Sequence, residues 1–281
     1  MNYKYIFVDG PYLSHKSFGA PYKVVTSDGL DATMVHSFIS SMNALRKKFE
    51  PERMVVAWES HGTKSWRKNI NPSYKSRLKG NTHIFWDGIK DVQIILHLLG
   101  VKQYYSPSNE ADDVLANLCC QNSGNILVYT SDKDIMQLVS DTCHVYDGKT
   151  LFDSEKVREK FFVNPEQIPD LLAVWGDKTD NIEGINSYGI RKSAHLLNKY
   201  NSVEAIPKEH TVRKYMNKIL LNKKLATLNK NCMLYEIPNK DFKTNETIET
   251  MFNKYELKKM KNNINEYKLM GKGDLESWLK N

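Results

Sequence analysis

The sequence of 281 residues has few of the features that mark secreted, zinc-binding or membrane-spanning proteins. Its four cysteines form no Cys-x-x-Cys pair and no zinc-ligand spacing, which predicts reduced thiols. No apolar run approaches the roughly 20 residues that a membrane-spanning helix needs. The N-terminus begins with a strand pattern and shows no signal-peptide pattern. We therefore expect a cytoplasmic protein that does not associate with a membrane.

The sequence also has no excess of acidic residues. Lysine and arginine total 40 against 33 acidic residues, which gives a formal net charge of +7 and a pI near 9.0. A basic protein of this kind favours an anionic partner such as nucleic acid, although many soluble proteins share such a pI. Hydrophobic residues make up 41% of the chain, so a substantial core is expected.

Short apolar runs alternate with helix-like segments in the first half of the chain. This alternation predicts an α/β fold with a mostly parallel sheet. Beyond about residue 150 the pattern becomes mainly helical. We expect an α/β core over 1–150 and a helical region over 151–281 packed on it. Strands are predicted at 4–8, 53–58, 101–105 and 126–129, and helices at 31–49, 88–99, 110–120, 165–175, 189–200 and 212–230.

Acidic residues recur just after the predicted strands and at the starts of helices. In parallel sheets such positions converge at one edge, where carboxylates repel one another unless a cation neutralises them. Carboxylate oxygens favour Mg²⁺ or Mn²⁺, and two ions roughly 4 Å apart suit phosphodiester hydrolysis. Any single acid is more easily explained as a helix cap or turn residue. Their recurrence in five segments favours a divalent-metal site.

Two further segments carry a nucleic-acid signal. The stretch 60–85 mixes lysine and arginine with Trp66, Tyr74 and Phe85, and Trp86 follows directly; its weak apolar pattern predicts an exposed excursion. In the segment 180–194, Gly184 and Gly189 permit a tight turn before a helix whose first amides can bind phosphate. An ordinary helix–turn–helix corner is the alternative interpretation of this second segment.

Together these motifs resemble the 5′ nuclease superfamily, which includes flap endonucleases, bacteriophage 5′→3′ exonucleases and the 5′ nuclease domain of bacterial DNA polymerase I. The resemblance covers at least residues 4–206. It is carried by Phe7-Val8-Asp9-Gly10, Glu110-Ala111-Asp112-Asp113, Ser131-Asp132-Lys133-Asp134, and Gly176-Asp177 through Asp180-Asn181-Ile182. The resemblance implies a PIN-like core, a helical arch over about 60–85, and a helix–three-turn–helix over about 176–206.

The resemblance also implies roles for individual residues. Lys75 and Lys16 would act in catalysis with Asp9 and Asp132, and Tyr74 could stack on an unpaired base. Main-chain oxygens of Ile182 and Ile185 would hold K⁺. Two Mg²⁺ or Mn²⁺ ions would be held by Asp9, Glu59, Glu110, Asp112, Asp113, Asp132, Asp134, Asp177 and Asp180. DNA would be bound by Tyr74, Arg77, Lys79, Gly184, Ser187, Gly189, Arg191 and Lys192.

Three positions depart from the family pattern. Glu59 stands where an Asp is usual, and its longer side chain could ligate directly or through water. Arg77 lies two residues beyond Lys75 instead of three. In the helix–three-turn–helix, Ser187 replaces the usual middle glycine and Arg191 the usual lysine, which retains the charge.

The leading hypothesis is a metal-dependent 5′ nuclease, monomeric and acting on DNA with 5′ flaps or free 5′ ends in replication, repair or recombination. A bacterial cell or a phage-infected host would be its setting. One alternative is a branched-DNA-binding protein that has lost catalysis, which the retained acids disfavour. Another is a ribonuclease, with RNA–DNA hybrids as the credible substrate.

Overall fold

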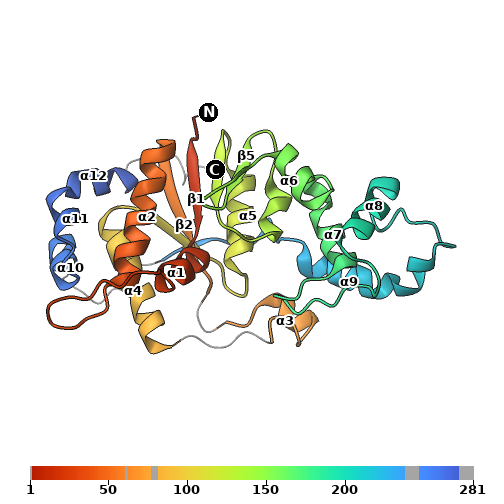
Figure 1. Ribbon diagram of the computed structural model, residues 1–281, viewed down its shortest axis with the longest axis horizontal. Coiled ribbons are helices and arrows are strands. Elements are labelled where there is room, and N and C mark those ends of the chain that lie inside the picture. Colours follow the sequence, from red (N-terminus) through yellow and green to blue (C-terminus); the bar gives the residue numbers. More distant parts are fainter. Residues whose placement is uncertain (1, 61–62, 77–81, 238–246, 272–281) are drawn as a thin grey trace.

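The computed structural model describes residues 2–60, 63–76, 82–237 and 247–271 (Figure 1). Its centre is a seven-stranded sheet with the order β6-β5-β4-β1-β2-β3-β7. Strands β1 to β5 pair in parallel, and the two short edge strands pair antiparallel. The predicted mostly parallel sheet is therefore confirmed. The strands are β1 (Tyr5–Asp9), β2 (Arg53–Ala57), β3 (Lys102–Tyr105), β4 (Ile126–Tyr129), β5 (Cys143–Tyr146), β6 (Leu151–Phe152) and β7 (Tyr235–Glu236).

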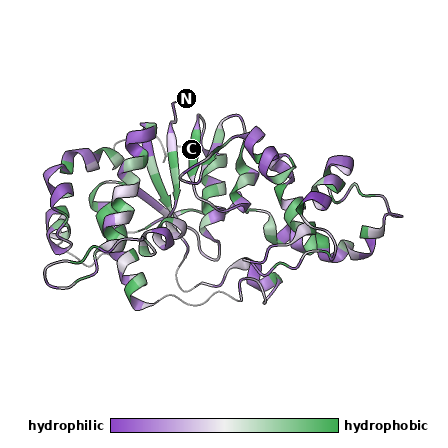
Figure 2. Cartoon of the chain, in the orientation of Figure 1, coloured by the Kyte–Doolittle hydropathy of each residue, from purple (hydrophilic) through white to green (hydrophobic). Residues whose placement is uncertain are grey.

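Both faces of the sheet are covered, because alternate residues of each strand point to opposite sides. In β1, Ile6 and Val8 join one apolar cluster while Tyr5 and Phe7 join the other. Figure 2 shows hydrophobic residues along the central strands and hydrophilic residues on the outer helices. The Ile6 face is covered by α1 (Gly10–Phe18), α2 (Thr33–Phe49) and α4 (His83–Leu98).

The Phe7 face is covered by helices from the middle of the chain. The predicted helix–three-turn–helix, about 176–206, corresponds to the loop after Trp175, the helix Ile190–Tyr200 and the turn that follows it. No helix of the described residues is long and apolar enough to cross a membrane. The elements on this side are α5 (Ala111–Gln121), η1 (Asp134–Leu138), α6 (Ser154–Phe161), η2 (Pro165–Gln167), α7 (Ile168–Trp175), α8 (Ile190–Tyr200), η3 (Thr211–Tyr215) and α9 (Met216–Ala226).

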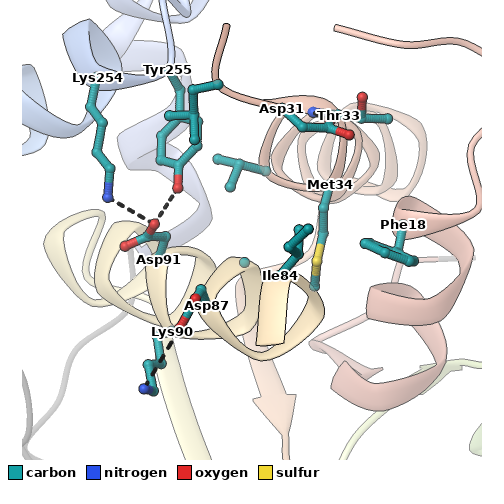
Figure 3. Close-up of a pocket in the computed structure, with 13 residues that line it drawn as sticks. Phe18, Asp31, Thr33, Met34, Ile84, Asp87, Lys90, Asp91, Lys254 and Tyr255 are labelled. Atoms are coloured by element: carbon teal, nitrogen blue, oxygen red, sulfur yellow. Dashed lines mark hydrogen bonds and ion pairs between the residues drawn. The ribbon is translucent and has the colours of Figure 1, made fainter. Parts of the chain in front are cut away.

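The region beyond residue 150 divides between the two faces. After β7 pairs with β3 at the sheet edge, the chain returns to the Ile6 face, beside α2 and α4 (Figure 1). Met251 and Phe252 join the apolar cluster there, and Asp91 on α4 accepts hydrogen bonds from Lys254 and Tyr255 beside a cavity of about 410 Å³ (Figure 3). These last elements are α10 (Ile248–Lys254), α11 (Lys258–Asn262), α12 (Ile264–Lys268) and η5 (Leu269–Gly271).

The segment predicted as an exposed excursion is partly interior. It contains α3 (Trp66–Ile70), which Ser65 caps by accepting a hydrogen bond from the Arg67 amide. Arg67 and Tyr74 are only 2% and 1% exposed, so the expectation of an exposed segment is wrong for both. Their polar atoms have buried partners, which a pattern of basic and aromatic residues cannot reveal.

Candidate metal centre and phosphate site

A cavity of about 630 Å³ opens at the carboxyl ends of the central strands. The strand order reverses between the neighbouring strands β1 and β4, because the chain continues from β1 to β2 on one side and from β4 to β5 on the other. Ligands of α/β sheets bind at such a reversal point. Lysines and an indole share the walls with the acids, so the cavity suits a metal ion and a phosphate together. Its lining includes Asp9, Glu59, Glu110, Asp112, Asp132, Lys64, Lys68, Lys75 and Trp86.

Asp9 is fixed at the end of β1 by two hydrogen bonds. Its Oδ1 accepts from the Tyr12 amide at 2.9 Å, which caps α1, and its Oδ2 accepts from the Thr130 hydroxyl at 2.7 Å. Burial, together with the nearby charges of Asp132 and Glu59, raises the pKa of Asp9 to about 6 despite these bonds. Because its ionised form is disfavoured, a cation beside this carboxylate would stabilise it.

Asp112 and Glu110 enter the same cavity from the start of α5. Burial and the charges of Asp132 and Asp9 raise the pKa of Asp112 well above its ordinary value. Glu110 caps α5, and its Oε2 accepts hydrogen bonds from Lys75 at 2.9 Å and from the Tyr74 hydroxyl at 3.1 Å. The predicted acids of this group are therefore brought together.

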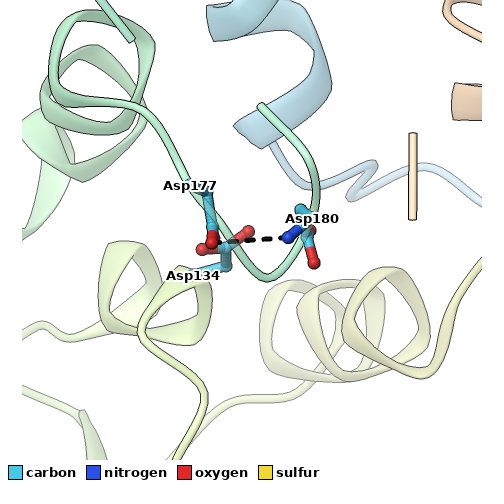
Figure 4. A group of neighbouring side chains, drawn as sticks. All are labelled: Asp134, Asp177 and Asp180. Atoms are coloured by element: carbon cyan, nitrogen blue, oxygen red, sulfur yellow. Dashed lines mark hydrogen bonds between the residues drawn. The ribbon is translucent and has the colours of Figure 1, made fainter. Parts of the chain in front are cut away.

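A second group of acids lies beside the cavity and is buried. Asp134 begins η1, while Asp177 and Asp180 come from the loop after α7 (Figure 4). One carboxylate oxygen from each lies within 4.8 Å of the others. Burial, followed by the charges of the neighbouring aspartates, raises the pKa of Asp134 well above normal.

The residues of this second group fit a divalent cation. The Oδ1 atom of Asp134 is buried and has no hydrogen-bond partner among the described residues. An unpaired buried carboxylate oxygen is costly unless a cation completes its environment. Three aspartate oxygens also form the hard donor set that Mg²⁺ and Mn²⁺ prefer. This trio of Asp134, Asp177 and Asp180 is called the inner trio below.

Lys75 and Tyr74 join the two acidic groups. The Lys75 ammonium lies 2.9 Å from Glu110 and 3.8 Å from Asp180. Burial alone would lower its pKa, but Glu110 and Asp180 raise it well above normal, so Lys75 stays charged. The Tyr74 hydroxyl donates to Asp180 at 2.6 Å. Because the ring of Tyr74 is buried, the predicted stacking on a base is not available in this arrangement.

Two other predicted site residues lie elsewhere. Asp113 is 0% exposed, and its oxygens accept from Arg67, Trp66 and two backbone amides, so it holds Arg67 instead of facing the cavity. Lys16 donates to the Tyr129 hydroxyl at 2.8 Å and does not line the cavity. The predictions for Arg77 and Lys79 fall outside the described residues.

The two glycines of the turn between α7 and α8, Gly184 and Gly189, differ in how strictly the structure requires them. A Cβ on Gly184 would lie 2.0 Å from the Trp175 carbonyl oxygen, so glycine is required there. Ser187 has a φ of +66°, a conformation that favours glycine. Gly189 caps α8, and nothing would contact an added Cβ. Arg191 and Lys192 follow it and are exposed, as phosphate binding would need.

Residues that sequence reasoning missed hold the acids in place. Lys133 forms an ion pair of 2.6 Å with Asp177, and Thr130 supports Asp9. Arg67 was recognised only as part of a basic stretch. Lys133 could have been predicted from the sequence, because it stands between two predicted ligands, Asp132 and Asp134.

Comparison with known proteins identifies the family. The model of the 5′-3′ exonuclease N-terminal resolvase-like domain matches residues 4–162, and that of the 5′-3′ exonuclease C-terminal SAM fold matches residues 163–250. The chain belongs to the 5′-3′ exonuclease family. Membership makes it a 5′ nuclease, a hydrolase that cleaves nucleic-acid phosphodiester bonds.

Individual members of the 5′-3′ exonuclease family and solved structures agree with this assignment. A 5′-3′ exonuclease of Aquifex aeolicus is 34% identical over 206 residues, which is 72% of this chain and 71% of the relative. A zinc-bound bacteriophage T5 5′-exonuclease has a TM-score of 0.66 at 19% identity, covering 82% of this chain and 90% of that one. A T5 flap endonuclease complex with DNA and metal ions has a TM-score of 0.65 at 19% identity, covering 94% and 98%. The structural likeness confirms the fold.

Proposed function

We propose that this 5′ nuclease cleaves DNA at 5′ flaps and free 5′ ends with two divalent ions, Mg²⁺ or Mn²⁺. The single observation that supports this most is the cavity lined by carboxylates, with the inner trio buried beside it. One ion would be held by Asp9, Glu59, Asp112 and Asp132 with Glu110 nearby, and the other by the inner trio.

The bound ions supply a Lewis acid and lower the pKa of attacking water. The chain's own residues orient the ligands and stabilise charge on the phosphate. Thr130 and the Tyr12 amide fix the orientation of Asp9. Lys75 lies at the cavity wall, where its ammonium can stabilise negative charge that develops on the phosphate. Tyr74 holds Glu110 and Asp180 at a fixed separation through one hydroxyl.

DNA would be bound by two surfaces, one in the cavity wall and one at the start of α8. Lys64, Lys68 and Trp86 line its wall and suit a single-stranded 5′ end, because basic and aromatic side chains bind backbone and bases without sequence preference. Exposed Arg191 and Lys192 with the first amides of α8 suit the phosphates of the adjoining duplex. Arg77 and Lys79 would add to the first surface.

The turn before α8 would also bind K⁺ through the carbonyls of Ile182 and Ile185. Each accepts one backbone hydrogen bond, from Asp177 and from Tyr188, and a carbonyl oxygen has a second lone pair. Potassium-dependent tightening of duplex binding by the Asp132→Asn variant, with Na⁺ as control, tests this site.

Cleavage of a 5′-flap duplex by the monomer in Mg²⁺ tests the proposed activity. We expect cleavage that leaves a 5′-phosphate and a 3′-hydroxyl, and its abolition by EDTA. The Asp132→Asn variant should lose cleavage and largely retain DNA binding. Cleavage that persists in EDTA would contradict the proposal. Parallel assays with RNA and RNA–DNA hybrids at one salt concentration would rank the substrates, since phosphate-driven affinity depends on salt.

A further inference from the structure

Lys133 is the cation that lies closest to the inner trio in the described part of the chain. Its ammonium is 2.6 Å from Oδ2 of Asp177, whose side chain is 4% exposed. The ammonium therefore places a positive charge beside the three acids.

The two oxygens of Asp177 have different partners. Oδ1 accepts from the Thr179 amide at 2.8 Å and from the Asp180 amide at 3.4 Å, which orients the carboxylate within its loop. Oδ2 is paired with Lys133. A metal ion that is coordinated by all three acids needs an Asp177 oxygen, and Oδ2 is the one free of backbone bonds. Lys133 and the ion therefore compete for the same atom.

Charge makes the competition nearly exclusive. A divalent ion bound within the inner trio would lie within a few ångströms of an ammonium on Asp177, where like charges in a buried setting repel strongly. The lysine side chain is long and flexible, and Lys133 is half-buried, so it can move towards solvent. The carboxylates have no such freedom, because Asp134 and Asp180 are both 7% exposed.

We propose that Lys133 is a tethered cation that a divalent ion must displace from Asp177 before it can bind the inner trio. The inference rests on the proposed two-metal function. It makes the inner trio the weaker of the two metal sites, filled only at higher ion concentration. It also explains how the acids are held together before the ion binds, since the ammonium offsets part of their repulsion.

Mn²⁺ titration of the full chain by calorimetry tests the proposal. Lys133→Met removes the competing charge and keeps much of the side-chain length, so the weaker class of sites should bind Mn²⁺ about tenfold more tightly. The matched control is Lys178→Met, because Lys178 is adjacent to Asp177 but exposed. It should change Mn²⁺ affinity less than twofold. Lys133→Arg, which keeps the charge, should bind as the wild type does.

Thermal unfolding separates competition from a purely structural ion pair. In EDTA, Lys133→Met should melt at a lower temperature than the wild type, because Asp177 then has no cationic partner. Saturating Mn²⁺ should remove most of this difference. If Lys133→Met fails to fold, Lys133→Gln and Lys133→Arg provide the same comparison of neutral and charged side chains.

The outcomes distinguish this inference from the proposed function. Unchanged or weaker Mn²⁺ binding by Lys133→Met, while Asp177→Asn removes the weaker class, overturns the tethered-cation role and leaves the two-metal function intact. No measurable Mn²⁺ binding by the wild type, or no effect of Asp177→Asn, overturns the proposed metal site and this inference with it.

Discussion

The guanidinium of Arg67 forms two parallel hydrogen bonds, of 2.7 and 2.8 Å, to the carboxylate of Asp113. Arg67 also donates to the Leu225 carbonyl at 2.7 Å, so one side chain connects α3, α5 and the end of α9. The segment that carries Tyr74 and Lys75 begins directly after α3. This buried ion pair therefore fixes where Lys75 meets the acids.

Replacement of Arg67 by Gln should destabilise the protein by about 3 kcal/mol or more, because it leaves Asp113 charged and unpaired in the interior. Urea unfolding in EDTA measures the loss. Lys64→Gln is the control, since Lys64 is exposed in the same segment and should cost less than about 0.5 kcal/mol. Equal losses in the two variants would contradict a buried anchoring role for Arg67.

Replacement of Lys75 by Met should lower the rate of flap cleavage by about 10²- to 10³-fold, the usual cost of removing one group that stabilises transition-state charge. Single-turnover cleavage in saturating Mg²⁺ provides the rate. DNA affinity measured in Ca²⁺ should change only a few-fold. Lys90→Met on α4 is a control, because Lys90 is exposed and pairs only with Asp87 among the described residues. A wild-type rate in Lys75→Met would exclude this role.

The inner trio predicts a stability change that depends on pH and metal. The pKa of Asp134 is raised in the folded protein, so its contribution is favourable below the unfolded pKa and is lost as pH rises through the folded pKa. In EDTA at pH 7.5, Asp134→Asn should therefore be more stable than the wild type, and the gain should shrink at pH 5. With Mg²⁺ at pH 7.5 the order should reverse.

Asp141→Asn is the matched control for that measurement, since Asp141 is exposed. Comparing each variant with the wild type at the same pH cancels the opposing effect of His15 and His36. Burial lowers the pKa of His15 and His36, which favours the folded state at higher pH. A pH-independent difference for Asp134→Asn would show that the carboxylate is not strained.

Alanine substitutions at the two glycines of the turn before α8 should differ in their cost to stability. Gly184→Ala places a methyl group against the Trp175 backbone and should cost at least about 2 kcal/mol, with weaker duplex binding. Gly189→Ala has open space and an ordinary φ of −72°, so it should cost less than about 1 kcal/mol. Chemical unfolding of both variants measures the contrast.

The sequence predicted those features that depend on local pattern. Apolar runs marked β1, β2 and β4, and the acids that follow them meet at one edge because parallel strands bring their carboxyl ends together. The helix over 31–49 is confirmed as α2, since its apolar residues recur at helical spacing. The two short antiparallel edge strands were missed, because two residues carry no periodicity.

Pairwise partners lay beyond what the pattern could reveal. Asp113 follows Asp112 directly, yet the helix turns the two side chains apart, so one faces the cavity and the other binds Arg67. Spacing of two or three residues limits which acids can share a face. It does not tell which of them meets a buried cation from a segment some 46 residues away in the chain.

The return of the chain to the Ile6 face has a consequence for synthesis on the ribosome. Every acid of the site has been made by residue 180, whereas Met251, Phe252 and Met260, which belong to the same apolar cluster as Ile6, emerge later. A nascent chain therefore passes through a stage in which the future ligands have been made and the apolar cluster beside α2 and α4 is still incomplete. The last helices therefore complete an apolar cluster that also contains Ile6 and Val8 of the first strand.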